Sequence, residues 1–279
     1  MPKDLPKFFH LHLVSDATGE TLSAIAKAAI VQYSDIRSIE HVHSLVRTKK
    51  QLERVLQEIE TSPGIVLYTL VNPDLAHQLE DHCKSLNVPS VPVLSSVMAV
   101  FESYLGAPAT PTVGGQHVLD AAYFKRIDAL NFTMEHDDGH LPQNLEDADI
   151  IILGISRTSK TPTSIYLAQR GFKTTNLPLI PQIPIPKSLE DSKNIFVVGL
   201  VASADRISQV RRNRVLALAD RNLDEYVDRG MIEEEIAYTR RLCNRHGWPV
   251  IDVTRRSVEE TAAAILTQYH ERSSKKAEK

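Results

Sequence analysis

The chain has 279 residues, nearly twice the length of a typical domain of about 150 residues, so we expect two lobes or one large α/β domain. Its 32 basic and 35 acidic side chains leave a net charge of −3, and this balance argues against nucleic acid or a membrane surface as the partner. No apolar run reaches about 18 residues, the length that a membrane-spanning helix needs. The two cysteines, Cys83 and Cys243, are too few for a disulfide framework or a cysteine-rich zinc site, and we expect the reducing cytoplasm as the compartment.

The first third of the sequence alternates short apolar runs with helical patterns. This alternation is typical of parallel strands covered by helices, so we predict an N-terminal α/β lobe over residues 1–105. The expected strands are 8–14, 39–46, 65–71 and 91–94, and the expected helices are 21–33, 49–60 and 73–86.

The middle of the chain, residues 106–148, differs in composition and is predicted to be a linker with a connecting helix. Glycines and prolines between 106 and 115 indicate a loop. A helix is expected over 121–132, and the acidic loop 136–140 follows it.

The second half returns to alternating strands and helices, which predicts a C-terminal α/β lobe over residues 149–272 and a frayed polar tail over 273–279. The expected strands are 149–154, 172–177, 195–201 and 250–253; the expected helices are 160–170, two long ones within 205–245, and 258–269; and 178–186 is a proline-rich segment.

The clearest functional signal is a strand, a tight loop and a helix within residues 151–164. Gly154, Ser159, Lys160 and Thr161 follow the phosphate-loop spacing G-x4-G-K-[ST], except that Ser159 replaces the second glycine. Backbone N–H groups and a helix N-terminus surround phosphate in such a loop, and its threonine can hold Mg²⁺. We predict nucleotide or phosphate binding; the alternative is a Ser/Thr-rich helix cap. The candidate binding residues are Gly154, Ile155, Ser156, Arg157, Thr158, Ser159, Lys160 and Thr161.

Two cations of this loop are candidate catalytic residues. Lys160 can reach the terminal phosphates, and Arg157 can contact the oxygens of a phosphoryl group in transfer, although an arginine beside an exposed loop is often a plain surface charge. If Ser159 has a positive φ, serine is unfavourable there, and the loop would differ in shape from a standard phosphate loop.

The acidic loop His136-Asp137-Asp138-Gly139-His140 is the second candidate site. Adjacent carboxylates can hold Mg²⁺, and one of them can act as a base toward a hydroxyl group. The alternative is an acidic turn that bends at Gly139. The sequence does not distinguish Asp137 from Asp138 as the catalytic carboxylate.

Other acidic and basic residues give weaker signals. Asp16 follows the first strand, where ligands of open α/β sheets bind, or it caps the next helix. Arg206, Arg211 and Arg214 could form a phosphate clamp or a solvated helix face. Asp252 follows a short strand and could contact Mg²⁺, but the match is unspecific.

Pairs of histidines mark two of the expected strands. His10 and His12, and likewise His41 and His43, place two imidazoles on one strand face. With the histidines of the acidic loop they would suit a metallohydrolase. The alternative is two half-exposed strands with histidines on the solvated side.

Three segments together resemble a known family. Residues 154–179 (GISRTSKTPTSIYLAQRGFKTTNLPL), 12–22 (HLVSDATGETL) and 136–139 (HDDG) are similar to the bacterial pyruvate, phosphate dikinase regulatory proteins. The resemblance extends from about residue 10 to residue 270. Related phosphoenolpyruvate synthase regulatory proteins usually carry glycine where Ser159 stands, so the serine is similar to the dikinase branch.

This resemblance implies a bifunctional enzyme. Such proteins phosphorylate a threonine near the catalytic histidine of the dikinase, with ADP as donor and AMP as product. They also remove that phosphate with inorganic phosphate as acceptor and pyrophosphate as product. The resemblance further implies the dikinase as protein partner and a homodimer, and the loop threonine and the acidic loop lead us to expect Mg²⁺ as cofactor. Four alternatives stay open: a phosphate-loop kinase for a small molecule, phosphoenolpyruvate synthase as the target, a nucleotide-sensing binding protein, and the metallohydrolase.

Overall fold

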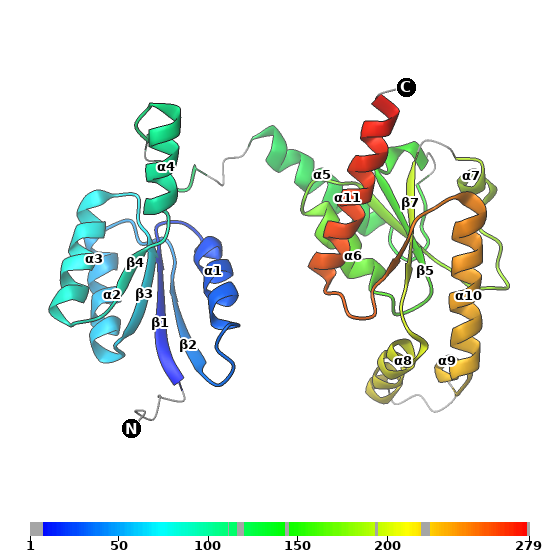
Figure 1. The fold of residues 1–279 in the computed structure, drawn as a ribbon, viewed down its shortest axis with the longest axis horizontal. Coiled ribbons are helices and arrows are strands. Elements are labelled where there is room, and N and C mark those ends of the chain that lie inside the picture. Colours follow the sequence, from blue (N-terminus) through cyan, green and yellow to red (C-terminus); the bar gives the residue numbers. More distant parts are fainter. Residues whose placement is uncertain are drawn as a thin grey trace. The chain divides into compact units, whose positions relative to one another are not determined.

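The computed structural model describes residues 8–110, 112–115, 120–142, 145–192, 195–218 and 224–277. The chain divides into two compact units, residues 1–118 and residues 119–279 (Figure 1). Each unit contains its own four-stranded parallel sheet. The α/β fold with two lobes, predicted from the alternating patterns, is therefore confirmed.

The N-terminal unit has the strand order β2-β1-β3-β4. Helices α2 and α3 cover one face of its sheet and α1 covers the other (Figure 1). The alternation along β1 explains both layers, because Leu11 and Leu13 pack with α1 while Val14 packs with α2 and α3. Its elements are β1 (Phe8–Ser15), α1 (Glu20–Ile30), β2 (Arg37–His43), α2 (Lys49–Thr61), β3 (Gly64–Thr69), α3 (Pro73–Ser85), β4 (Ser90–Pro92) and α4 (Ser95–Leu105).

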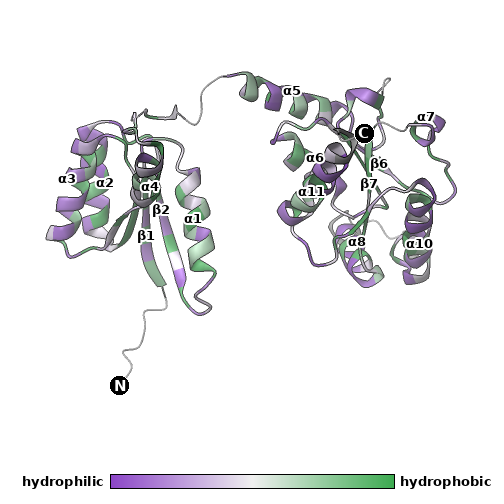
Figure 2. Cartoon of the chain, turned by 45° about the horizontal axis from the view of Figure 1, so that its top comes forward, coloured by the Kyte–Doolittle hydropathy of each residue, from purple (hydrophilic) through white to green (hydrophobic). Residues whose placement is uncertain are grey.

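The C-terminal unit has the strand order β6-β5-β7-β8. All residues of β5 and β7 are buried, and Figure 2 shows β7 mostly in the green of hydrophobic residues; its sequence FVVGLV is interrupted by Gly199. Such runs fit a parallel sheet with helices on both faces. Its elements are α5 (Ala121–Glu135), a 3-10 turn (Leu145–Asp147), β5 (Ile150–Gly154), α6 (Lys160–Ala168), β6 (Thr174–Pro178), α7 (Lys187–Glu190), β7 (Phe196–Val201), α8 (Ala204–Leu218), α9 (Asp224–Val227), α10 (Arg229–His246), β8 (Val250–Asp252) and α11 (Val258–Ala277).

Four features of this arrangement differ from the elements that the sequence led us to expect. Helix α4 was not expected, and none of its residues is buried. Helix α5 packs against α6 and β6 and belongs to the C-terminal unit. The region 205–245 holds the short helix α9 besides two long helices. Helix α11 continues to Ala277, through most of the expected tail.

The two sheets have the same strand connectivity, and this connectivity indicates where a ligand would bind. In each sheet the first strand lies between the second and the third, so the chain changes direction at that strand. Ligands of open parallel sheets bind at this switch point, beyond the carboxyl ends of the strands. The positions are the segment after β1 in one unit and the segment after β5 in the other.

Candidate functional site

The predicted phosphate loop joins β5 to α6 at the switch point of the C-terminal unit. It begins at Gly154, which must be glycine because of a close backbone approach. A Cβ atom there would lie 2.7 Å from the carbonyl oxygen of Leu200 and 2.8 Å from Oγ1 of Thr158. The loop is therefore pressed against the end of β7, and this contact sets its path toward α6.

Two residues of the loop have left-handed backbone conformations. Arg157 has φ = 73° and Ser159 has φ = 60°. Ser159 is the N-cap of α6 and makes no side-chain hydrogen bond in that role. The sequence indicated that a positive φ would be unfavourable for this serine, and the chain adopts that conformation nonetheless. Backbone strain of this kind is found where the surrounding structure and a function hold a residue in place.

Lys160 lies over the loop and is buried, with 7% of its surface exposed. Its Nζ atom donates a hydrogen bond to the carbonyl oxygen of Ile155 at 3.0 Å, and Oγ1 of Thr158 donates to the same oxygen at 3.0 Å. Burial lowers the pKa of Lys160 to about 8, although the charges of Asp138 and Asp137 act in the opposite direction. A partly desolvated ammonium group beside a loop of this spacing is suited to bind phosphate oxygens.

Asp137 of the acidic loop reaches the phosphate loop through Thr161. Oγ1 of Thr161 donates to Oδ1 of Asp137 at 3.1 Å. Nδ2 of Asn176, on β6, donates to the same carboxylate oxygen. The backbone N–H of Gly139 donates to the carbonyl oxygen of Asn176 at 3.0 Å and ties the acidic loop to β6. The structure thus brings two predicted sites together, although 24 residues separate their contacting members.

The two carboxylates of the acidic loop have different surroundings. Asp137 is held by Thr161 and Asn176. Asp138 is exposed, has φ = 49°, and its side chain makes no hydrogen bond within the described residues. The sequence left these two residues equivalent, whereas the structure assigns one to the threonine of the loop and leaves the other accessible.

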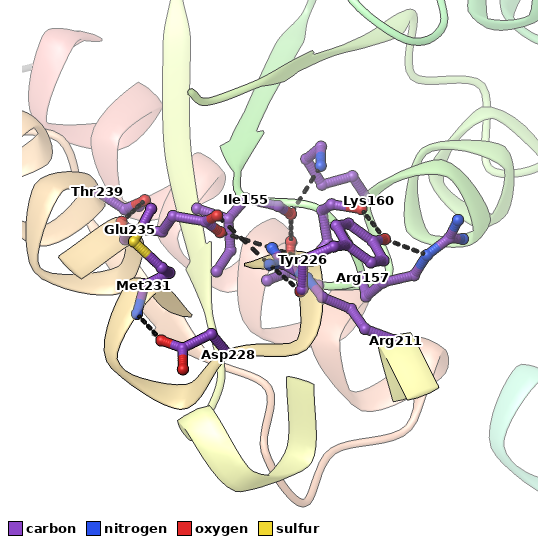
Figure 3. Close-up of polar contacts among 11 residues, drawn as sticks. Ile155, Arg157, Lys160, Arg211, Tyr226, Asp228, Met231, Glu235 and Thr239 are labelled. Atoms are coloured by element: carbon purple, nitrogen blue, oxygen red, sulfur yellow. Dashed lines mark hydrogen bonds and ion pairs between the residues drawn. The ribbon is translucent and has the colours of Figure 1, made fainter. Parts of the chain in front are cut away.

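Tyr226 of α9 covers the other side of the loop (Figure 3). Its hydroxyl group is 2.9 Å from Oγ of Ser156, and Nε of Arg157 donates to it at 3.3 Å. Burial raises the pKa of Tyr226, but its hydrogen bonds with Ser156 and Arg157 and the charges of Arg157 and Arg211 outweigh this, and the net pKa lies below the usual value. The tyrosine therefore holds the otherwise exposed side chain of Arg157 at the loop.

Arg211 is buried behind Tyr226 (Figure 3). Its Nη2 atom donates to Oε2 of Glu235 at 2.5 Å, and its Nη1 atom donates to the carbonyl oxygen of Tyr226 at 3.0 Å. A longer bond of 3.4 Å joins Nη2 to the carbonyl oxygen of Ser156. The sequence suggested Arg211 as part of a phosphate clamp. Its hydrogen bonds instead connect α8 with α9, α10 and the loop.

The remaining predicted residues make no contact with the phosphate loop within the part of the C-terminal unit that the structure describes, or belong to the other unit. Arg206 and Arg214 are exposed, and neither bonds to the loop in the described part of the chain. Asp252 accepts hydrogen bonds from the backbone N–H and the hydroxyl group of Thr254 at 2.9 and 2.5 Å, and its other oxygen lies 3.5 Å from Arg240. Asp16 belongs to the N-terminal unit.

The histidine pairs form a stack across β1 and β2. Nδ1 of His10 is 2.9 Å from Nε2 of His41, and Nδ1 of His12 is 3.2 Å from Nε2 of His43. The rings of His12 and His43 are parallel, and burial lowers the pKa of both. Across the described ranges, no group of three or more His, Cys, Asp or Glu side chains is arranged to hold a metal ion.

A divalent cation that bridges protein and phosphates needs fewer protein ligands than such a group. Mg²⁺ prefers oxygen ligands and commonly binds through one or two carboxylates together with substrate phosphates. Thr161 and Asp137 supply a hydroxyl and a carboxylate oxygen 3.1 Å apart beside the loop. This pair of oxygen donors fits a Mg²⁺ ion that is shared with a nucleotide.

Sequence reasoning missed three residues of this site: Asn176, Tyr226 and Glu235. Their side chains arrive from β6, α9 and α10, and Tyr226 lies 70 positions from Ser156. Asn176 lies in a segment that resembles the regulatory-protein family, which was the only signal in the sequence that could have identified it.

The sequence model of the kinase/pyrophosphorylase family matches residues 11–266. The chain belongs to this family. The match includes the phosphate loop, the acidic loop and the segment after β1.

Related chains in this family are similar over nearly their whole length. A protein of Chelativorans sp. (strain BNC1) is 63% identical over 259 residues, which cover 93% of this chain and 95% of the relative. A protein of Bradyrhizobium diazoefficiens is 57% identical over 266 residues, with 95% of both chains covered. A protein of Brucella anthropi is 60% identical over 261 residues, covering 93% and 94%. All three carry the name "Putative pyruvate, phosphate dikinase regulatory protein".

Within the described ranges, no helix is both long enough and apolar enough to cross a bilayer.

Proposed function

We propose that this chain is a bifunctional enzyme acting on pyruvate, phosphate dikinase. In one direction it transfers the β-phosphoryl group of ADP to a threonine near the catalytic histidine of the dikinase and releases AMP. In the other it transfers that group to inorganic phosphate and releases pyrophosphate. The family description and the names of relatives more than half identical to this chain support the proposal.

The observation that carries this proposal is the contact between Thr161 and Asp137. A phosphate loop alone would fit many nucleotide-binding proteins. A carboxylate bound to the threonine of that loop adds the partner that kinases use to hold Mg²⁺ against nucleotide phosphates. The contact therefore favours phosphoryl transfer over nucleotide sensing.

Each residue of the site has its own role in phosphoryl transfer. The loop N–H groups, Lys160 and Arg157 bind the phosphate oxygens and compensate their charge as the phosphoryl group moves. Thr161 and Asp137 would hold Mg²⁺, which would neutralise charge on the phosphate oxygens when bound. Asp138, accessible beside Lys160, accepts the proton of the target hydroxyl group in the forward direction.

The reverse reaction uses the same groups. An oxygen of inorganic phosphate attacks phosphothreonine, the bond from phosphorus to the threonine oxygen breaks, and Asp138 returns a proton to that oxygen. Both directions move one phosphoryl group between oxygens and depend on positioning and charge compensation. A single phosphate loop can therefore serve both, with the ADP β-phosphate in one direction and inorganic phosphate in the other.

The proposal extends to the cellular compartment and the oligomeric state of the enzyme. We place it in the cytoplasm, because the dikinase is a metabolic enzyme and the chain has two free, buried cysteines. We also propose a homodimer, which size-exclusion chromatography with light scattering would test: a mass near twice 31.2 kDa supports the dimer, and a mass of one chain contradicts it.

A transfer assay tests the proposed function. The chain is mixed with dikinase that carries phosphate on its catalytic histidine, and ADP labelled at the β-phosphate is supplied, with ATP in parallel. Acid-stable label on a dikinase threonine from ADP, and labelled pyrophosphate after addition of inorganic phosphate, are the expected results. Label on phosphoenolpyruvate synthase instead would change the target. No label on either protein would overturn the proposal in favour of a small-molecule kinase.

A further inference from the structure

Asn176 of β6 is fully buried and carries a polar atom without a partner. Its Oδ1 atom makes no hydrogen bond within the described part of the chain, whereas its Nδ2 atom donates to Oδ1 of Asp137. A buried acceptor without a partner costs free energy, so such atoms are rare in folded proteins. A bound ion or a role in catalysis is a common reason for one beside a functional site. The oxygen of Asn176 is therefore a candidate ligand atom.

The amide group of Asn176 lies against the two oxygen atoms that we assign to Mg²⁺. Its Nδ2 atom is bonded to Oδ1 of Asp137 and lies 3.5 Å from Oγ1 of Thr161. These two oxygens are themselves 3.1 Å apart. Oγ of Ser164, one turn further along α6, lies 3.5 Å from the same nitrogen. The amide nitrogen thus occupies a point where a third ligand of the cation would lie.

A half-turn of the amide group exchanges its oxygen and its nitrogen. The oxygen then lies beside Oδ1 of Asp137 and about 3.5 Å from Oγ1 of Thr161. Neighbouring ligands of an octahedral Mg²⁺ ion are about 3 Å apart, because each lies about 2.1 Å from the ion. The half-turn breaks no hydrogen bond of Oδ1, since this atom has no partner among the described residues. It converts a buried acceptor without a partner into a possible metal ligand.

The two orientations of the amide group suit two states of the site. Without a cation, the carboxylate of Asp137 is stabilised by hydrogen-bond donors, and Asn176 supplies one of them. With a cation in place, an N–H group at that point is repelled, whereas a carbonyl oxygen is a ligand that Mg²⁺ prefers. The backbone of Asn176 stays where it is, because it pairs with Ile152 of β5 and accepts from the N–H of Gly139.

We propose that Asn176 supplies a third protein oxygen to the divalent cation held by Thr161 and Asp137, and that its amide group turns when the cation binds. This inference rests on the proposed function, which assigns Mg²⁺ to that pair. Three protein ligands leave the other positions of an octahedral ion for nucleotide phosphates and water. All three ligands are oxygen atoms, which favours Mg²⁺ or Mn²⁺ over softer metals.

Replacing the amide by a thiol tests whether residue 176 contacts the metal. Asn176→Cys should bind Cd²⁺ in the presence of ADP and show a thiolate-to-cadmium absorption band in the ultraviolet, because thiolates are ligands of soft metals. Its affinity for Cd²⁺ relative to Mn²⁺ should exceed that of the unsubstituted chain by about a hundredfold or more. The native cysteines, Cys83 and Cys243, are present in every variant and cancel in this comparison.

Thr175→Cys is the matched control for the thiol. Thr175 is as fully buried as Asn176 and lies next to it on β6, but its hydroxyl group donates to the carbonyl oxygen of His136 at 2.6 Å. Successive side chains of a strand point to opposite faces of the sheet, so a thiol at position 175 lies away from the cation. This variant should show neither the absorption band nor the change in metal preference.

Two further variants measure the ligand without a change of metal. Asn176→Leu keeps most of the side-chain volume but has no ligand atom, so it should bind Mn²⁺ in the presence of ADP about tenfold more weakly or worse. Its affinity for ADP alone should stay within about twofold. Asn176→Asp offers an oxygen in both orientations and should bind Mn²⁺ at least as tightly as the unsubstituted chain. Electron paramagnetic resonance of free Mn²⁺ gives these affinities, and thermal unfolding confirms that each variant is folded.

The contrary results separate this inference from the proposed function. If the unsubstituted chain binds Mn²⁺ but Asn176→Cys shows no cadmium band, the amide only orients Asp137 as a donor, and the inference is overturned. Unchanged Mn²⁺ affinity in Asn176→Leu, or loss of it in Asn176→Asp, overturns it as well. If the unsubstituted chain binds ADP but no Mn²⁺, the cation site of Thr161 and Asp137 is itself wrong. A failed transfer assay with intact Mn²⁺ binding would refute the proposed function and leave the ligand role of Asn176 standing.

Discussion

Oγ1 of Thr161 donates a hydrogen bond to Oδ1 of Asp137, and this bond joins the phosphate loop to the acidic loop. Thr161 is the second residue of α6, and Asp137 lies in the loop that follows α5. Asn176 donates to the same carboxylate from β6, so three separate elements fix its position. A carboxylate held in this way is preorganised, which is the property that binding of a cation beside nucleotide phosphates requires.

The first prediction separates the two carboxylates of the acidic loop. Asp137→Asn should lower both transfer rates at least tenfold and raise the Mg²⁺ concentration needed for half-maximal activity, because the amide cannot replace a charged oxygen ligand. Asp138→Asn should lower the rates by about 10²- to 10⁴-fold without this change in the Mg²⁺ requirement, because it removes a base.

Steady-state rates in both directions across a Mg²⁺ titration measure these effects. Asp191→Asn is the control, since Asp191 is exposed and belongs to neither loop. Near-normal rates in both variants would show that the acidic loop is structural. An equal increase of the Mg²⁺ requirement in both would contradict the division of roles between the two carboxylates.

The second prediction concerns the buried charge of Lys160. Its folded-state pKa of about 8 lies below the ordinary value of 10.5, so between these values the unfolded chain binds more protons than the folded one. The stability of the protein should therefore rise with pH from about 8 to about 10.5, and the cost of the buried charge is fully present below pH 8. The 2.5-unit difference corresponds to a cost of about 3 kcal/mol.

Lys160→Met removes that charge and keeps most of the side-chain volume. It should stabilise the fold at pH 7 by about 1–2 kcal/mol, because loss of the hydrogen bond to Ile155 offsets part of the gain. Transfer and nucleotide binding should be greatly weakened. Urea denaturation at pH 7 and pH 10 measures the stability, and the gain should shrink at the higher pH. A variant with unchanged transfer rates would contradict the role of Lys160 in phosphate binding.

The sequence predicts local features of this site well and long-range ones poorly. Residues 150–161 are contiguous, so the strand, loop and helix follow from spacing and residue type, whereas the positive φ of Ser159 was only considered as a condition. The bonds of Asp137 to Thr161 and of Tyr226 to Ser156 depend on how separate elements pack, which no periodicity encodes. Helix α4 was also not expected from the sequence, and none of its residues is buried.

The third prediction uses the left-handed conformation of Ser159. Ser159→Gly should stabilise the fold by about 1 kcal/mol, because glycine adopts φ = 60° without steric cost. Ser273→Gly in helix α11 is the control and should destabilise by about 0.5 kcal/mol, since the helical conformation suits serine better than glycine. Thermal unfolding of both variants is the measurement. A loss of stability in Ser159→Gly would mean that the serine side chain, rather than the backbone, determines the loop.

The last prediction concerns the hydroxyl group of Tyr226. Tyr226→Phe removes the bonds to Oγ of Ser156 and Nε of Arg157, while the ring can still stack on the guanidinium of Arg211, whose central carbon lies 4.5 Å from the ring centroid. The fold should lose only about 1 kcal/mol, the usual contribution of a hydrogen bond. Arg157 is then free to leave the loop, so the transfer rate should fall about tenfold or more.

Comparison with Arg157→Ala decides whether the tyrosine acts through the arginine. If it does, the double variant Tyr226→Phe/Arg157→Ala should be no slower than Arg157→Ala alone, because effects transmitted through one residue are not additive. Tyr238→Phe is the control, since the hydroxyl group of Tyr238 makes no hydrogen bond within the described residues. Additive losses would instead assign Tyr226 a contact of its own with the substrate. An unchanged rate in Tyr226→Phe would show that Arg157 needs no support from α9.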